Sequence, residues 1–131
     1  MVSILLVEDH TTFAGVLVRL LTTTKDMAIT TIATTAERAL QELPIHKFDL
    51  VLVDVSLPQM NGISLVGLIR DRYPDLPCLM LSGHALSHYM NRALDAGARG
   101  YILKDNAKGI IEGIRRVLKG EIYVSKELRR G

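Results

Sequence analysis

Residues 49–62 read DLVLVDVSLPQMNG, and the prediction of the fold starts from this stretch. Five of the six residues from Leu50 to Val55 are apolar, and the exception is Asp54. A short apolar run of this kind is typical of a strand that is buried on both faces of a parallel sheet. Pro58 and the pair Asn61-Gly62 favour a turn, which delays the next helix until Gly62. The stretch therefore predicts a buried strand that presents Asp54 at its carboxyl end instead of burying it.

Four other segments have the composition of short strands. The run Ile4–Val7 ends at the acids Glu8 and Asp9, which repeats the order of apolar strand and acid. The remaining strands are expected at Met27–Ala33, Pro77–Leu81 and Gly100–Leu103, with Asp49–Val53 as the third strand in the chain.

Helical spacing of apolar residues predicts five helices between and after these strands. The first is expected to begin with Thr11 or Thr12 as its N-cap, and the second follows Thr34 or Thr35. The third ends before Pro74, and the last two are followed by Gly97 and Gly120. The five helices are expected to end near Leu21, Leu43, Tyr73, Ala96 and Lys119. The fourth is expected to begin at about Leu86 and the fifth at about Ala107.

Strands that alternate with helices through short loops predict an α/β fold, a doubly wound parallel sheet with right-handed crossovers. With five strands and five helices, the flavodoxin-like order 2-1-3-4-5 fits. The first and third strands are neighbours in that order, so the carboxyl edge of the sheet should bring Glu8, Asp9 and Asp54 together. Ser82 and Lys104 follow the fourth and fifth strands and should reach the same edge.

Composition limits the classes of protein that this sequence can encode. A chain of 131 residues with 48% hydrophobic and 23% charged residues fits one globular domain. The single Cys78 lies in an apolar run and predicts a buried thiol without a disulfide. The sequence has the pattern of neither a signal peptide nor a membrane span, so a cytoplasmic location is expected. Six of the sixteen Lys and Arg residues lie between Arg115 and Arg130, which is explained more simply by helix C-terminal charge than by nucleic-acid binding.

The expected cluster of carboxylates has a specific chemistry. Three carboxylates in one crevice repel one another unless they hold protons or a cation. Oxygen ligands without a cysteine or histidine cluster favour Mg²⁺, which often bridges to phosphoryl groups. An Asp carboxylate is a nucleophile for phosphoryl transfer, and Lys104 and Ser82 could contact the phosphoryl oxygens.

The ordered motifs LLVEDH, VLVDVSLPQMNG, MLSGH and ARGYILKD resemble the receiver domain of two-component response regulators (CheY-like) over residues 2 to about 120. This resemblance implies that Asp54 is the phosphoacceptor, and that Glu8, Asp9, Asp54 and the backbone carbonyl of Ser56 serve Mg²⁺. It further implies that Ser82 is the switch hydroxyl, Lys104 the family lysine and Tyr101 the switch aromatic. The implied partner is a sensor histidine kinase.

The form YILKD, the EDH opening and the ending GEIYVSKEL are similar to the NarL/FixJ type of response regulator. The resemblance implies a receiver domain over residues 1–120 and the start of a linker over 121–131. In that type the linker leads to a helix-turn-helix DNA-binding domain, which would be absent from this chain. A homodimer could form through either of two faces: the first and fifth helices, or the fourth helix with the fifth strand and fifth helix.

The sequence also leaves other functions open. A haloacid-dehalogenase-like phosphatase also uses a strand-end Asp nucleophile, but it needs a second Asp two residues later, where this chain has Ser56. A flavin carrier on the same fold needs a phosphate-binding loop where this chain has Glu8-Asp9. A stand-alone receiver and an interaction module that works without phosphorylation are the remaining alternatives. His84 and His88 are interpreted as solvated histidines, and His84 as a hypothetical modulator of access to the phosphoryl group.

Overall fold

The structure is a computed structural model that describes residues 1–83 and 87–128. Its six strands form one parallel sheet in the order β2-β1-β3-β4-β5-β6, which confirms the predicted order of the first five and adds a short sixth. The strands are β1 (Val2–Val7), β2 (Met27–Ala33), β3 (Leu50–Asp54), β4 (Cys78–Ser82), β5 (Gly100–Leu103) and β6 (Tyr123–Val124).

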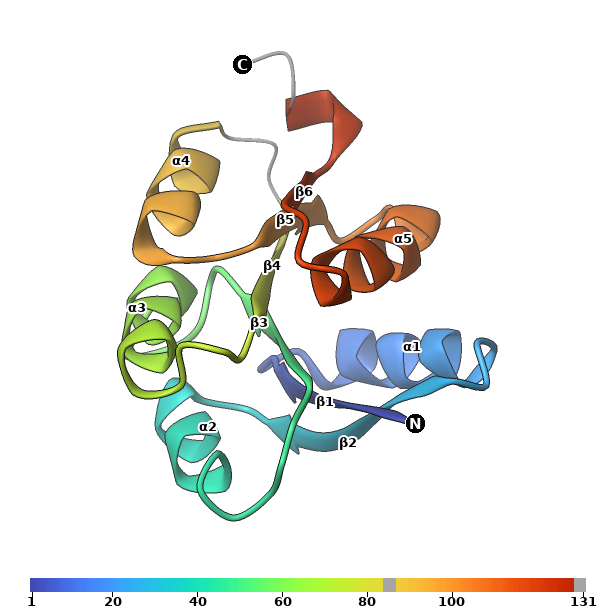
Figure 1. Cartoon of the computed structure of the whole chain (residues 1–131), viewed down its shortest axis with the longest axis horizontal. Helices are drawn as coiled ribbons and strands as arrows, with labels where there is room; N and C mark the ends of the chain where they lie inside the picture. Colours follow the sequence, from blue (N-terminus) through green and yellow to red (C-terminus); the bar gives the residue numbers. More distant parts are fainter. Residues whose placement is uncertain (84–86, 129–131) are drawn as a thin grey trace.

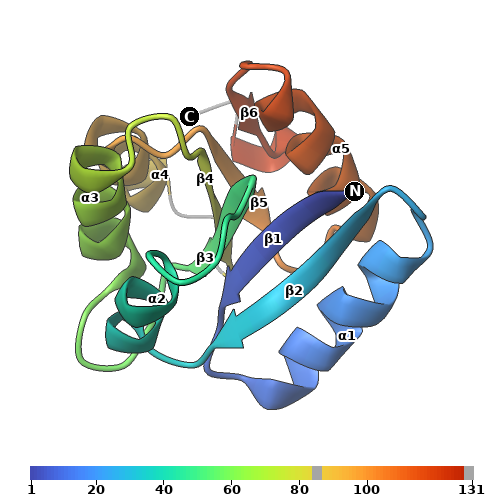
Figure 2. The ribbon, with the colours of Figure 1, turned by 60° about the horizontal axis from the view of Figure 1, so that its bottom comes forward.

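Helices cover both faces of this sheet. Figure 1 shows α1 and α5 on one side of the strands and α2, α3 and α4 on the other, and Figure 2 shows β1 and β2 side by side in the same direction. The helices are α1 (Thr11–Thr22), α2 (Ala36–Glu42), α3 (Gly62–Arg72), α4 (Ser87–Ala96), α5 (Ala107–Leu118) and a final 3₁₀ turn, η1 (Lys126–Leu128). Leu86, the expected start of the fourth helix, lies outside the described residues.

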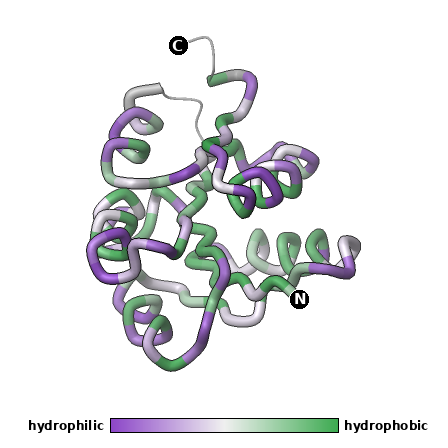
Figure 3. Tube along the Cα trace, viewed as in Figure 1, coloured by the Kyte–Doolittle hydropathy of each residue, from purple (hydrophilic) through white to green (hydrophobic). Residues whose placement is uncertain are grey.

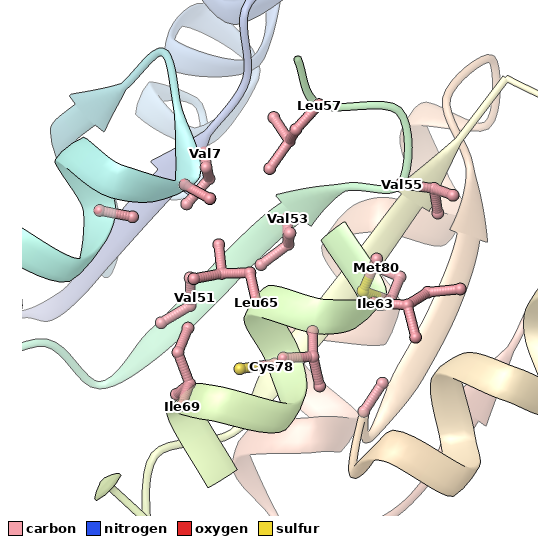
Figure 4. Close-up of a cluster of buried hydrophobic side chains, with 14 of the residues drawn as sticks. Val7, Val51, Val53, Val55, Leu57, Ile63, Leu65, Ile69, Cys78 and Met80 are labelled. Carbon is pink, nitrogen blue, oxygen red and sulfur yellow. The ribbon is translucent and has the colours of Figure 1, made fainter. Parts of the chain in front are cut away.

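The central strand β3 is buried over its whole length, as its apolar run predicts. Its side chains alternate between two apolar layers: Val51 and Val53 face α3, whereas Leu50 and Leu52 join the layer under α1 and α5. Figure 4 shows Leu65 and Ile69 of α3 next to Val51 and Val53, and Ile63 next to Met80. Hydrophobic segments accordingly follow the strands in Figure 3, and hydrophilic ones the outer helix surfaces.

The ends of the helices agree with the sequence in most places and differ at α1. Thr35 caps α2, because its hydroxyl accepts a hydrogen bond from the backbone N–H of Arg38 at 3.1 Å. The expected cap of α1 at Thr11 or Thr12 is wrong, because His10 is the N-cap and Thr11 is already helical. The Glu8 carboxylate accepts a hydrogen bond from the His10 N–H at 3.1 Å, which holds His10 in its extended conformation.

Residues 121–128, which we call the C-terminal strap, pack on the edge of the sheet next to β5. The N–H of Tyr123 bonds to the carbonyl of Arg99 at 3.0 Å, and the N–H of Ser125 bonds to that of Tyr101 at 3.0 Å. Tyr123 is buried in the layer under α5, and Leu128 is buried in the opposite layer with Tyr101. The strap therefore straddles the edge strand and contributes to both cores, although the sequence pattern predicts no sixth strand.

Among the described residues, no helix combines the length and the apolar character needed to cross a membrane.

Candidate functional site

Acidic side chains meet where β1 and β3 end. β1 and β3 are direct neighbours, with Val7 opposite Val53, so the residues that follow them leave the sheet together. Glu8 follows β1 and is fully buried, Asp9 follows it and is exposed, and Asp54 is the last residue of β3. The convergence of these acids at the carboxyl edge agrees with the sequence prediction.

Lys104 joins two of these acids. It follows β5, and its backbone N–H bonds to the carbonyl of Ser82 at 2.9 Å. Its Nζ lies 2.8 Å from Oε1 of Glu8 and 3.3 Å from Oδ2 of Asp54. One ammonium group is thus shared by two carboxylates that come from different strands.

Asp54 is more buried than its sequence context predicts. Only 3% of the residue is exposed, which corrects the expectation that the strand presents it at the surface. The reason is that the loop after β3 folds back, with the N–H of Gly62 bonded to the carbonyl of Val55 at 3.0 Å, while Lys104 covers the carboxylate from the other side. The N–H of Ser56 donates to Oδ1 of Asp54 at 3.0 Å. Access is retained through a cavity of about 570 Å³, lined in part by Asp9, Asp54, Ser56 and Lys104.

The pKa of Glu8 reflects chiefly the burial of its carboxylate. Burial raises the pKa of Glu8, and the nearby Asp54 charge adds to this effect, whereas the contacts with Lys104 and the His10 N–H oppose it. Burial alone would lower the pKa of Lys104, but its contacts with Glu8 and Asp54 outweigh burial and raise it. Lys104 therefore opposes the effect of burial on the pKa of Glu8 without cancelling it.

Glu8 and the two residues after it form a group that could hold a hard divalent cation. Ligand atoms of Glu8, Asp9 and His10 lie within 4.8 Å of one another. Carboxylate oxygens fit Mg²⁺. His10 is not predicted as a member of this group from the sequence. Its position directly after Glu8 and Asp9 is the feature that could have indicated it. Asp54 is linked to Glu8 of this group by Lys104, whose ammonium group contacts both carboxylates.

Ser82 and Tyr101 lie on the strands beyond Asp54. Ser82 ends β4 and is buried, and Leu81 before it is opposite Asp54 in the sheet register. Ser82 also lines a cavity of about 420 Å³ with Ser56, on the side of α4. Tyr101 lies in β5 with its side chain fully buried, and burial raises the pKa of its hydroxyl group.

Cavity size does not identify the site in this protein. A larger cavity of about 660 Å³ is lined by residues 43–49 and by Tyr73, Asp75 and Leu76, in loops that enter the amino ends of β3 and β4. It is therefore at the opposite edge from the carboxylates. His84 lies outside the described residues, as does the side chain of His88.

Comparison with known proteins places this arrangement in a family. The model of the response regulator receiver domain matches residues 4–120. The chain is 29% identical over 124 residues to the transcriptional regulatory protein DegU of Brevibacillus brevis, covering 94% of this chain and 52% of DegU. It is 36% identical over 105 residues to the DNA-binding transcriptional activator DevR/DosR of Mycobacterium tuberculosis, covering 80% of this chain and 48% of DevR/DosR. The chain thus spans about half the length of these curated relatives.

Solved structures agree with the family match. A LuxR-family two-component response regulator from Aurantimonas sp. SI85-9A1 superposes with a TM-score of 0.94 at 26% identity, over 98% of this chain and 92% of that one. The receiver domain of the putative response regulator NarL from Mycobacterium tuberculosis gives a TM-score of 0.85 at 26% identity, over 92% of this chain and 98% of that one. The ordered motifs, the parallel sheet with its acids at the carboxyl edge and these matches lead to one conclusion: the chain belongs to the response regulator receiver domain family.

Proposed function

We propose that this chain is a phosphorylation-controlled switch in which Asp54 accepts a phosphoryl group from a sensor histidine kinase. The observation that carries the proposal is the cluster in which Lys104 Nζ lies 2.8 Å from Glu8 and 3.3 Å from Asp54. The three residues follow or end three different strands, so the fold itself assembles the cluster.

The transfer replaces one bond to phosphorus with another. A carboxylate oxygen of Asp54 forms a P–O bond while the P–N bond to the imidazole of the donor breaks, and the released imidazole takes a proton from solvent. Such transfer depends mainly on the position of the reactants and on neutralisation of the phosphoryl charge. Lys104 supplies a positive charge beside Asp54, and Ser82 supplies a hydroxyl group near the strand end.

Mg²⁺ is the proposed cofactor, held by the carboxylates of Glu8, Asp9 and Asp54 and by the backbone carbonyl of Ser56. When bound, it would neutralise phosphoryl oxygens and offset the repulsion between the carboxylates. The support for a cation here is that ligand atoms of Glu8, Asp9 and His10 lie within 4.8 Å of one another.

The switch that we propose runs from Ser82 to Tyr101. Both side chains are buried on neighbouring strands, and the register of β4 and β5 sets Tyr101 opposite Met80, two residues before Ser82. A change at Ser82 on phosphorylation would alter the packing of Tyr101. Since Tyr101 and Ser125 share a backbone hydrogen bond, this change would reach the C-terminal strap.

The output that we propose is control of transcription by a further domain. The support is that the curated relatives DegU and DevR/DosR are named as transcriptional regulators, and that this chain spans about half of their length. DNA would then be contacted through that output domain, and a homodimer and a cytoplasmic location complete the proposal. Because Ser56 stands where a phosphatase has its second Asp, the only catalysis proposed is phosphoryl transfer to and from Asp54 itself.

Intact mass spectrometry tests this proposal without knowledge of the kinase. We expect the chain to gain the mass of one phosphoryl group when it is incubated with acetyl phosphate and Mg²⁺. The Asp54→Asn variant should gain none, and chelation of Mg²⁺ with EDTA should prevent the gain in the wild type. An unmodified wild-type chain, or an equal gain in Asp54→Asn, would refute the proposal.

A further inference from the structure

The ammonium group of Lys104 lies over an aromatic ring. The centroid of the Phe13 ring is 4.8 Å from Lys104 Nζ. Phe13 is the third residue of α1, is half-buried, and lines the same 570 Å³ cavity as Asp54 and Lys104. The ammonium group is thus bounded by two carboxylates and by the face of a ring.

This contact acts on a side chain that could otherwise move. A lysine side chain has several rotatable bonds, and 19% of the Lys104 side chain is exposed at the cavity. The face of an aromatic ring attracts a cation through its quadrupole, more strongly where the cation is desolvated. The ring also excludes water from one side of the ammonium group. A leucine of similar bulk would keep the apolar packing but not this attraction.

From this geometry we propose that Phe13 is a positioning residue that holds Lys104 beside Asp54 for phosphoryl transfer. The inference rests on the proposed function, because it assigns a role in that same reaction. Phe13 acts through Lys104 and need not touch the phosphoryl donor. Sequence periodicity identifies Phe13 only as an apolar residue of the first helix, since an aromatic residue at helical spacing is equally consistent with simple packing.

Substitutions of Phe13 that keep or remove the aromatic ring separate a positioning role from simple packing. We expect Phe13→Leu to slow phosphorylation by acetyl phosphate at saturating Mg²⁺ by about two- to thirtyfold, the range that a lost cation–π contact implies. Phe13→Tyr keeps the ring face and should retain the wild-type rate. Arg19→Ala, at an exposed α1 residue outside the lining of this cavity, is the control and should also retain it. Thermal melts establish that each variant is folded under the assay conditions.

Proton NMR gives a second result that does not depend on activity. A ring above the ammonium group shifts the ε-methylene protons of Lys104 upfield, and the resonance is assigned by its loss in Lys104→Gln. We expect the upfield shift in the wild type and in Phe13→Tyr, and its loss in Phe13→Leu.

The outcomes distinguish this inference from the proposed function on which it rests. A wild-type chain that gains no phosphoryl group refutes the proposed function and the role of Phe13 together. A phosphorylated wild type whose rate is unchanged in Phe13→Leu, or equally reduced in Phe13→Tyr, overturns only the role of Phe13. The absence of an upfield shift in the folded wild type also overturns it.

Discussion

At the scale of single residues, Gly62 allows the loop after β3 to fold back onto the residue proposed to accept the phosphoryl group. A Cβ atom at this position would overlap the carbonyl oxygen of Asp54 and would lie 3.0 Å from the methyl group of Met80. Because the obstacle includes backbone, a side chain here must displace the end of β3. The glycine therefore preserves the position of Asp54.

We expect Gly62→Ala to lower the free energy of unfolding by about 1–3 kcal/mol through this overlap, and to slow phosphorylation by displacing Asp54. Gly67 provides the matched control, since it lies inside α3 and a Cβ atom there would meet nothing within 4 Å among the described residues. Gly67→Ala should raise the free energy of unfolding by up to about 1 kcal/mol. Urea unfolding measures both, and equal effects of the two substitutions would contradict the account.

Cys78 is a second residue with a measurable consequence of burial. It is the first residue of β4 and is 3% exposed, and burial raises the pKa of its thiol from 9.0 to about 12. The folded state thus favours the protonated thiol, so this group lowers stability as the pH rises above 9.0, where the unfolded thiol ionises.

We expect iodoacetamide at pH 8 to leave Cys78 unmodified in the folded chain, because the thiolate is the reactive form and the sulfur is enclosed. The same reagent should label Cys78 completely in concentrated urea. Mass spectrometry detects the label, and modification of the folded chain at the rate seen in urea would show that the thiol is accessible.

At the scale of elements, the C-terminal strap is joined to the receiver fold by more than backbone pairing. The Tyr123 hydroxyl donates to Oε2 of Glu112 at 3.1 Å, and Arg116 of α5 contacts Glu121 at 3.1 Å. The hydroxyl of Ser125 accepts a hydrogen bond from the Leu103 N–H at 3.1 Å, at the end of β5 next to Lys104. These contacts link the strap to α5 and to β5, the strand that carries Tyr101.

Two adjacent residues of the strap are expected to differ strongly in their effect on stability. Tyr123 is 7% exposed, so Tyr123→Ala should lower the free energy of unfolding by about 3 kcal/mol through the lost packing. Ile122 is 63% exposed, and Ile122→Ala should change it by less than about 0.5 kcal/mol. Urea unfolding tests the pair, and a negligible effect of Tyr123→Ala would mean that the strap is not part of the folded core.

Strands with a continuous apolar run could be predicted from the sequence, whereas the two-residue strand β6 could not. β3 and the other central strands have continuous apolar runs that local pattern alone can identify, and Gly97 and Gly120, with φ of 117° and 90°, mark helix ends through backbone chemistry. β6 has only two residues, Tyr123 and Val124, so its pairing depends on the tertiary edge that β5 offers. Helix α1 begins at Thr11, directly after His10, because the Glu8 carboxylate accepts the His10 N–H and holds His10 as the N-cap.

The sequence was enough to predict which residues of the candidate site lie near one another, because the strand order brings the carboxyl ends of the strands to one edge of the sheet. Its electrostatics were not, because the burial of Asp54 depends on how the loop and Lys104 cover it. The contact between Phe13 and Lys104 likewise requires the position of α1 relative to the end of β5.

At the scale of the whole molecule, the basic residues near the C-terminus are partly engaged in local ion pairs. Arg115 contacts both carboxylate oxygens of Asp26, at 2.7 and 3.1 Å, which joins α5 to the loop before β2 and lowers the pKa of Asp26. Arg116 contacts Glu112 at 3.5 Å and Glu121 at 3.1 Å. These pairs agree with the interpretation that the local positive charge serves the helix and not nucleic acid.

We therefore expect this chain by itself to bind duplex DNA of arbitrary sequence no more tightly than about 10⁻⁴ M at physiological salt, the weak end of non-specific binding. Fluorescence anisotropy with a labelled duplex measures this affinity. Micromolar binding that weakens steeply with added salt would contradict the expectation and would identify the basic surface as a DNA contact.

The central claim is that the fold presents one carboxylate, Asp54, to the phosphoryl donor. The most direct test is chemical mapping of the phosphorylated residue: after treatment with acetyl phosphate and Mg²⁺, borohydride reduces an aspartyl phosphate to homoserine, which tandem mass spectrometry locates in the sequence. The account predicts homoserine at position 54 and at no other acidic position. Reduction at Glu8 or Asp9 instead, or a phosphoryl group that survives borohydride on another type of residue, would contradict it.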